Sequence, residues 1–435
     1  MTELDGEALW RKGMKLIASI EEAGFAAYLV GGCVRDRLLG RALRDIDIAT
    51  SAFPEQVTAI FGKVVPTGLK HGTVTVLEDG CPFEVTTFRR ETAYSDGRHP
   101  DEVAFVPDLR TDLSRRDFTF NAMAVGSDGC LVDPFEGEAD LRRRVVRCVG
   151  DARERFGEDA LRMLRAIRFA AELRFELDEE LRSGLRAQRE RLALVAMERI
   201  GAELDKMAGG ADPGRAFALL ADSGLTRHAK ETVAAALPGR AELPPDARWS
   251  ELDDENARWA VLLLAAGMDA AGAGELARSL RFNGKRAARL AAALRVDGDL
   301  REAGFWEATD EAGRRRIWIR TALACGTEAA GLWLQAMRAA PSLAARRAAG
   351  GCAYWQPERL AAWLREMPAA SVSGLAVRGD ELVRLTGRKP GPWVAAALAS
   401  LLERVALGEL PNEAGPLLQA ASSFTGEREG EAGRI

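Results

Sequence analysis

A change in hydrophobic pattern near residue 140 constrains the fold of this chain more than any other feature of its sequence. Before that point, short runs rich in β-branched residues, such as GTVTVLE and CPFEVTTFRR, lie between polar turns and predict strands. Beyond it, long segments rich in Ala, Leu and Arg repeat their apolar residues with a helical period. We therefore predict an α+β protein, in which a small head with a mixed sheet and helices precedes an elongated all-α neck, body and tail.

The 435 residues exceed what a single hydrophobic core usually serves, so several domains are expected. We divide the chain into a head at 1–140, a helical neck at 141–210, a helical body at 211–300 and a helical tail at 301–425. The polar residues 426–435 are expected to form a disordered end.

Composition excludes several classes of protein. Six cysteines without a CxxC pair, together with only three histidines, disfavour a zinc site and a disulfide framework. The chain lacks an apolar run long enough to span a bilayer, and its first residues lack the apolar core of a signal peptide, so we expect a cytoplasmic protein. A net charge of −5 argues against non-specific coating of nucleic acid, although local basic patches can still bind RNA.

One stretch of the predicted head concentrates groups that bind phosphate and metal ions. The turn at Gly31 and Gly32 follows a predicted buried strand, and glycines let backbone N–H groups approach a phosphate closely. Arg35 can clamp the same phosphate with several donors. Asp45 and Asp47 alternate on an extended segment, so their side chains should point to one face. Two carboxylates on one face predict a Mg²⁺ site, completed by triphosphate oxygens and water.

Two metal ions would assist an in-line attack, and such sites often need a third carboxylate. Our candidate is Glu84, on a neighbouring predicted strand. A lone DxD is usually solvated surface and a lone Gly-Gly usually marks a turn. The prediction therefore depends on their joint occurrence, in which the DxD begins nine residues after Asp36.

The stretch LVGGCVRDRLLGRALRDIDIAT resembles the signature of the polymerase-beta-like nucleotidyltransferases, and specifically the branch of class II CCA-adding tRNA nucleotidyltransferases and bacterial poly(A) polymerases. The motifs cover roughly residues 28–200, and a weaker resemblance continues to Asn412. The resemblance implies template-independent addition of CCA to the 3′ end of tRNA from CTP and ATP, with Mg²⁺ as cofactor. Further motifs of the branch follow in order: Arg115-Arg116-Asp117-Phe118-Thr119, Glu158-Asp159-Ala160-Leu161-Arg162 and Glu198-Arg199-Ile200.

The segment GEDALRMLRAIRFAAEL is predicted to be one helix, on which Asp159 and Arg162 share a face and Arg165 and Arg168 continue the row. A carboxylate beside a guanidinium can satisfy the base edges of both cytosine and adenine. Guanine and uracil would set oxygen against carboxylate and N–H against guanidinium, and each unpaired buried group costs about 1–3 kcal/mol. The alternative is an exposed helix with salt bridges between residues three apart.

The resemblance implies this same base-reading function for Asp159 and Arg162, and a ribose contact for Asp117. For Glu198 and Arg199 we expect a structural function, bracing the helices behind the base pocket. The resemblance also implies contacts with the nucleotide or its phosphates for Gly32, Arg35, Arg116, Arg165 and Arg168.

The segment RRETAYSDGRHPDEVAF, residues 89–105, resembles the flexible loop of relatives that can add the final A, which argues against an enzyme that adds only C. We expect His99, in this loop, to contribute to packing or to act as a hinge. We expect His71 to be a structural turn residue. The tail at 301–425 is expected to hold tRNA, as elongated helical tails do in this family.

Several alternatives remain open at the level of sequence. An A-adding enzyme or a poly(A) polymerase would carry the same motifs, although the absence of a basic extension favours CCA addition. A small-molecule nucleotidyltransferase would need neither the base reader nor the helical arm. A non-catalytic RNA-binding protein would not need Asp45, Asp47 and Arg116. Expected partners are tRNA, CTP and ATP, without a membrane, and a homodimer is compatible with this layout.

Overall fold

The computed structural model describes residues 6–92, 102–231, 233–348 and 355–422. Residues 93–101 of the expected loop, with His99, and the expected disordered end at 426–435 therefore fall outside the described residues, whereas both ends of the loop segment form strands. The chain forms two compact units, Met1–Ala234 and Ala235–Ile435. The finer division into head, neck, body and tail stays a prediction.

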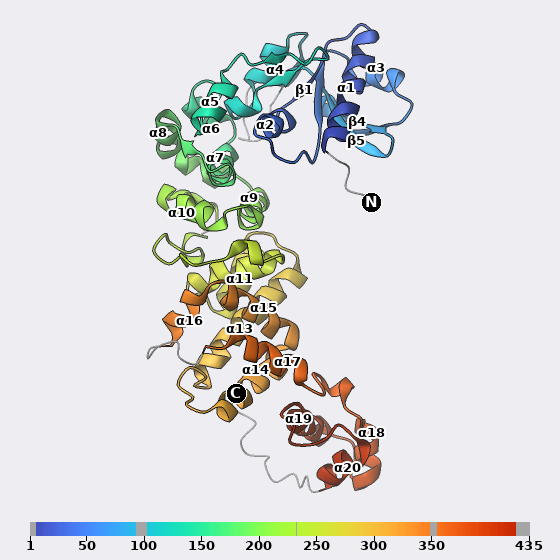
Figure 1. Cartoon of the computed structure of the whole chain (residues 1–435), viewed down its shortest axis with the longest axis vertical. Helices are drawn as coiled ribbons and strands as arrows, with labels where there is room; N and C mark the ends of the chain where they lie inside the picture. Colours follow the sequence, from blue (N-terminus) through green and yellow to red (C-terminus); the bar gives the residue numbers. More distant parts are fainter. Residues whose placement is uncertain (1–5, 93–101, 232, 349–354, 423–435) are drawn as a thin grey trace. The chain divides into compact units, whose positions relative to one another are not determined.

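A seven-stranded mixed sheet forms the centre of the N-terminal part of the first unit (Figure 1). β2 and β5 pair in parallel, whereas the other neighbours pair antiparallel. The strands predicted from the β-branched runs are all present, which confirms the mixed sheet and the α+β class. They correspond to β1, β2, β4 and β5, whereas the sequence did not predict β3, β8 and β9. In sheet order the seven strands are β3 (Val64–Gly68), β4 (Thr73–Glu78), β5 (Cys81–Thr87), β2 (Asp47–Thr50), β1 (Ala27–Val30), β8 (Ala124–Val125) and β9 (Leu131–Val132).

Two helices, α1 (Gly6–Glu22) and α3 (Pro54–Ile60), contact each other and the strands of this sheet (Figure 1). The contact with α1 is close, because a side chain at Gly13 would come within 2.9 Å of Ile46 Cγ2. Ile46 and Ile48 are each 1% exposed. Side chains alternate across a strand, so Asp47, between these two isoleucines, points away from this core.

A second, two-stranded sheet joins β6 (Arg89–Thr92) to β7 (Glu102–Phe105). The short helix α4 (Leu109–Ser114) contacts β6 and is capped by Asp108, which accepts from the backbone N–H of Thr111 at 2.9 Å. A carboxylate at this position satisfies N–H groups that have no partner within the helix.

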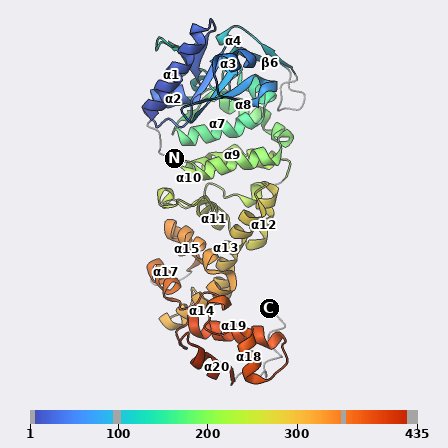
Figure 2. The same ribbon diagram turned by 90° about the vertical axis from the view of Figure 1, so that its right-hand side faces the viewer.

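Helices dominate the rest of the first unit, as the periodicity predicts. Figures 1 and 2 show α9 and α10 next to α7, and each of the three helices contacts the other two. A two-residue parallel pair, β10 (Val145–Val146) with β11 (Glu176–Leu177), is a small addition that the sequence did not indicate. The helices are α2 (Gly32–Leu38), α5 (Gly137–Arg143), α6 (Ala152–Glu158), α7 (Leu161–Glu172), α8 (Glu179–Gln188), α9 (Met197–Gly209) and α10 (Pro213–Ser223).

The prediction of one continuous helix through Asp159 is wrong. α6 ends at Glu158 and α7 begins at Leu161, with Asp159 in an extended conformation between them (φ −139°, ψ 105°). The side chain of Asp159 accepts from the backbone N–H of Leu161 at 3.0 Å. Short carboxylates compete with helical backbone bonds in this way and favour helix starts over helix interiors.

The regular elements among the described residues of the second unit are all helices, and three tryptophans (Trp259, Trp318 and Trp333) are fully buried in it. Asp297, 2% exposed, accepts from Trp333 Nε1 at 3.0 Å and from Arg347 Nε at 2.6 Å. No helix among the described residues is both long and apolar enough to cross a membrane. The helices are α11 (Glu255–Ala265), α12 (Ala270–Ser279), α13 (Gly284–Glu302), α14 (Glu311–Cys325), α15 (Thr327–Ala339), α16 (Pro341–Arg347), α17 (Pro357–Glu366), α18 (Gly379–Thr386), α19 (Pro392–Ala406) and α20 (Ala414–Ser422).

Candidate active site

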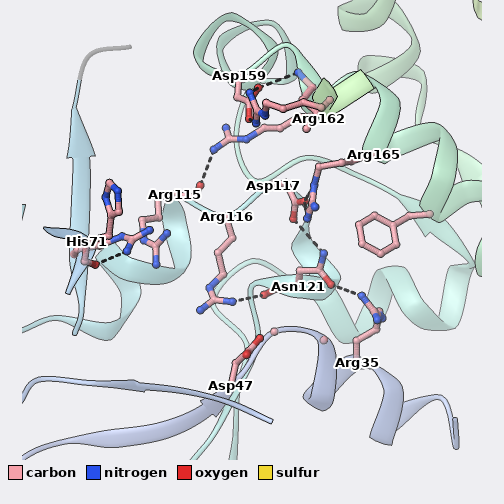
Figure 3. A pocket seen from close by; sticks show the side chains of 16 residues that line it. Arg35, Asp47, His71, Arg115, Arg116, Asp117, Asn121, Asp159, Arg162 and Arg165 are labelled. Carbon is pink, nitrogen blue, oxygen red and sulfur yellow. Dashed lines mark hydrogen bonds and ion pairs between the residues drawn. The ribbon is translucent and has the colours of Figure 1, made fainter. Parts of the chain in front are cut away.

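A cavity of about 570 Å³ in the first unit collects most of the residues that the motifs indicate (Figure 3). Seven arginines and three aspartates line it, which suits a ligand with several negative charges. The lining residues are Gly31, Gly32, Arg35, Asp47, His71, Arg89, Arg115, Arg116, Asp117, Asn121, Asp159, Leu161, Arg162, Arg165, Phe169 and Arg199.

The turn between β1 and α2 brings backbone close to one of these arginines. Gly31 has a φ of +77°, which side chains rarely tolerate. A Cβ atom at this position would lie 2.8 Å from Nη1 of Arg116. The backbone conformation therefore favours glycine at residue 31, and a side chain there would displace the end of Arg116.

A chain of hydrogen bonds joins α2 to α7 along the cavity (Figure 3). Arg35 Nη1 donates to Asn121 Oδ1 at 2.7 Å, and Asn121 Nδ2 donates to Asp117 Oδ1 at 3.1 Å. Arg165 completes the chain through two bonds to Asp117 Oδ2, at 2.8 and 2.6 Å. Burial alone would raise the pKa of Asp117, but the Arg165 guanidinium and the bond from Asn121 outweigh it and lower that pKa to about 2. The sequence reasoning missed Asn121, although it follows the RRDFT motif by two residues.

The three carboxylates predicted to bind metal lie near one another. Asp47 and Glu84 are partners in the register between β2 and β5, and Asp45 directly precedes β2. Burial, followed by the charge of Asp45, raises the pKa of Asp47 to about 6; Glu84 adds to this, while Arg116 opposes it. Carboxylates that disfavour each other's ionisation are a donor set that fits a hard divalent cation. Among the described residues, no group of three or more acidic, His or Cys side chains is placed to hold a metal ion by itself, so a cation here would need oxygen ligands from the triphosphate or water.

Asp159 and Arg162 both line the cavity, but they do not share a helical face as predicted. Asp159 lies between two helices, and Arg199 from α9 donates to both of its carboxylate oxygens, at 3.3 and 2.7 Å. Arg162, near the start of α7, donates to Glu158 Oε2 at 2.5 Å and to the Arg115 carbonyl at 3.0 Å. The turn between α6 and α7 thus brings Asp159 and Arg162 together. Arg199 holds Asp159, and Glu158 with the Arg115 carbonyl holds Arg162.

Arg199 is more than the brace behind the pocket that the sequence suggested, because it also lines the cavity. Glu198, its neighbour, is exposed. His71, expected to be a turn residue, does lie in a short 3₁₀ turn, Leu69–His71, and its carbonyl accepts from Arg89 Nη1 at 2.5 Å. It also lines the cavity, which its sequence context did not indicate.

Arg168 does not line the cavity, unlike Arg165 three residues earlier. Its Nε donates to Glu203 at 2.7 Å and its Nη1 donates to Glu172 at 3.0 Å. Its guanidinium also lies 4.1 Å from the centre of the Phe169 ring. Glu203 is 2% exposed, so it needs the cationic partner that Arg168 provides.

The fold and the site define a nucleotidyltransferase with the head of a poly(A) polymerase. The family described as poly A polymerase head domain matches residues 27–147. The family described as probable RNA and SrmB-binding site of polymerase A matches residues 174–237, and tRNA nucleotidyltransferase domain 2, putative, matches residues 330–421.

The CCA-adding enzyme of Geobacillus stearothermophilus is 37% identical over 414 residues, which cover 93% of this chain and 94% of that enzyme. The crystal structure of the Bacillus stearothermophilus CCA-adding enzyme in complex with CTP matches with a TM-score of 0.79 and 34% identity, covering 95% and 96% of the two chains. The Thermotoga maritima CCA-adding enzyme complexed with tRNA shares the fold, with a TM-score of 0.65 at 20% identity over 97% and 99% of the two chains. This chain belongs to the family of CCA-adding enzymes.

Proposed function

We propose that this chain, as a CCA-adding enzyme, extends the 3′ end of tRNA by C, C and A, using CTP and ATP and releasing pyrophosphate. One observation carries the proposal: a single cavity holds groups suited to a triphosphate at one end and a carboxylate–guanidinium pair at the other (Figure 3). The family named in the comparisons favours this activity over an A-adding enzyme, a poly(A) polymerase or a non-catalytic RNA-binding protein.

The triphosphate is assigned to the end of the cavity formed by Gly31, Gly32, Arg35 and Arg116. Glycine backbone allows close approach to phosphate oxygens, and guanidinium groups donate to two oxygens at once. Arg116 and Asp47 both lie beside the turn at Gly31, and the Arg116 charge acts on the Asp47 carboxylate, so Arg116 can reach phosphates next to the carboxylates.

Asp45, Asp47 and Glu84 are assigned to hold Mg²⁺, because their mutual repulsion and oxygen donors fit a divalent cation. Mg²⁺ held there would supply activation of the 3′-hydroxyl of the tRNA and neutralisation of charge on the pyrophosphate. Of the three carboxylates, Asp47 lines the cavity, at the end assigned to the triphosphate.

Asp159 and Arg162 are assigned to read the base. The Asp159 carboxylate accepts from the exocyclic amino group of cytosine or adenine, and Arg162 donates to the adjoining ring acceptor. Arg199 and Glu158 hold the two readers from outside, at 2.7 and 2.5 Å, which restricts their rotation before a nucleotide arrives. A base with the opposite pattern would leave two buried polar groups unpaired, at about 1–3 kcal/mol each.

Asp117 is assigned to the ribose, where a carboxylate can accept from the 2′-hydroxyl. Arg165 and Asn121 fix the orientation of its two oxygens, so a further hydrogen bond from the sugar would meet a rigid acceptor. Arg165 is assigned to nucleotide contact through the same network. Arg168 is assigned instead to support α7 against α9, through Glu203.

We extend this proposal to tRNA binding by residues 301–425, to a homodimer and to a cytoplasmic location. Family membership supports the binding of tRNA. The match of residues 330–421 to a tRNA nucleotidyltransferase domain favours a function in tRNA binding for this part of the chain.

An extension assay tests the proposed function directly. The substrate is tRNA lacking its 3′ CCA, incubated with Mg²⁺ and with CTP, ATP, both or neither. Addition of CC with CTP alone and of CCA with both nucleotides is the expected result. Extension only of tRNA that already ends in CC would indicate an A-adding enzyme, and long A tracts would indicate a poly(A) polymerase. Absence of extension would refute the proposal.

A further inference from the structure

Asp112 is a buried carboxylate to which neither the sequence motifs nor the assignments above give a function. It lies in α4, is 0% exposed and stands behind the lining of the cavity. Removing a carboxylate from water is costly unless it is paired and hydrogen-bonded. Its partners therefore indicate what it does.

Asp112 contacts three residues that line the cavity: Arg89, Arg115 and Arg116. Oδ1 accepts from Arg115 Nε at 3.0 Å and from the backbone N–H of Arg89 at 3.2 Å. Oδ2 lies 3.5 Å from Nη2 of Arg116. One carboxylate thus contacts the two adjacent arginines after α4, Arg115 and Arg116. It also accepts from the backbone of Arg89, the first residue of β6.

The positive charges of Arg115 and Arg116 repel each other, and five further arginines line the same cavity. Burial lowers the pKa of Arg116, and Asp112 is the strongest of the charges that oppose this effect. Within the described part of the chain, Asp112 Oδ2 and Arg116 Nε make no hydrogen bond. The Arg116 guanidinium forms the ion pair with Asp112 and a 3.4 Å bond to the Asn121 carbonyl.

We propose that Asp112 is a positioning residue for nucleotidyl transfer, which neutralises Arg115 and Arg116 from the buried side and holds them, with Arg89, for the triphosphate of the incoming nucleotide. The inference rests on the proposed function, because it requires that the cavity bind a nucleotide. Since CTP and ATP share the triphosphate, Asp112 affects both equally and leaves base choice unchanged.

The test is Asp112→Asn, which keeps the shape of the side chain and removes its charge. We expect kcat/KM to fall by the same factor for CTP and ATP, by about 10- to 100-fold, as for the loss of charged hydrogen bonds. The ratio of kcat/KM for CTP over UTP should stay constant. Calorimetry should show weaker CTP binding, a readout that remains informative even if the parent protein fails to extend tRNA.

Asp140→Asn is the matched control. Asp140 is 2% exposed and accepts from Thr119 Oγ1 at 2.6 Å and from Arg147 Nε at 2.8 Å, but neither partner lines the cavity. It should lose stability without the specific loss of CTP binding. Equal losses in the two variants would overturn the proposal, as would a folded Asp112→Asn protein within threefold of the parent.

Asp112→Glu provides a second variant if the asparagine protein does not fold. The glutamate keeps the charge, so a folded protein should recover most of the CTP affinity, measured per folded molecule by active-site titration. A folded glutamate variant with no recovery would contradict the proposal. Failure of both variants to fold would assign Asp112 to folding and would also overturn it.

Discussion

Replacing Arg162 by alanine should relax the choice of base more than it weakens nucleotide binding. Arg162 is 8% exposed and lines the cavity beside Asp159. Its guanidinium is already oriented by Glu158 and by the Arg115 carbonyl. An arginine held in this way has its guanidinium plane fixed in direction, which is what discrimination between base edges requires.

The magnitude follows from the number of groups left unpaired. Rejection of uracil depends on two mismatches, and Arg162 accounts for one of them. At about 1–3 kcal/mol for each unpaired buried group, its removal should lower the kcat/KM ratio of CTP over UTP roughly 5- to 150-fold. Triphosphate contacts made from Arg35 and Arg116 remain, so the affinity for CTP should fall by a smaller factor.

Single-nucleotide incorporation on tRNA lacking CCA, with CTP and UTP measured separately, provides the assay. Arg168→Ala is the control, because Arg168 lies on the same helix and pairs with buried Glu203 but does not line the cavity. Both variants should unfold at lower temperature, and only Arg162→Ala should lose selectivity. An unchanged CTP/UTP ratio in folded Arg162→Ala protein would refute the base-reading assignment.

Three further predictions concern other parts of the site. Asp47→Asn should abolish transfer while tRNA binding, measured by filter retention, persists; retained transfer would remove Asp47 from the metal site. The stabilising effect of Asp117 should be fully present above its ordinary pKa of 3.8 and lost as the pH falls toward 2, because folding lowers that pKa. Its size is on the order of 2 kcal/mol. The free energies of unfolding of the parent and of Asp117→Asn, measured in urea, should therefore converge at low pH. A difference that stays constant with pH would contradict the pairing with Arg165. Gly31→Ala should lose CTP binding through the clash with Arg116, whereas Gly24→Ala, with φ +92° and no atom within 4 Å of a Cβ, should only lower the melting temperature; equal CTP affinity in the two would show that the clash is relieved elsewhere.

Much of the fold follows from local pattern. The alternation in β5 buries Phe83 and Val85 and exposes Glu84 between them, as a half-buried strand requires. The same rule directs Asp47 away from Ile46 and Ile48, so the position of one predicted metal ligand could be inferred before the sheet was known. Positive φ at Gly31 likewise agrees with the Gly-Gly turn that the sequence predicts.

The predictions from sequence were wrong where a polar side chain has several possible partners and the fold determines which of them it meets. The helical period predicts that Asp159 belongs to one long helix, but its carboxylate instead accepts from the backbone N–H of Leu161 and pairs with Arg199, which lies 40 residues further along the chain. Arg165 and Arg168 lie on the same helical row. Which of them reaches the cavity depends on Glu203 of α9, a residue that no local pattern connects to α7.

The sequence by itself determined the class of the fold, the order of the motifs and the chemical types available to the site, because periodicity and turn chemistry are local properties of a chain. The tertiary structure decided which arginines pair with buried carboxylates and which line the cavity. That choice depends on distances between elements far apart in sequence, since a buried charge is stable only beside the partner that packing brings to it. Asn121 and Asp112 became visible only through those contacts.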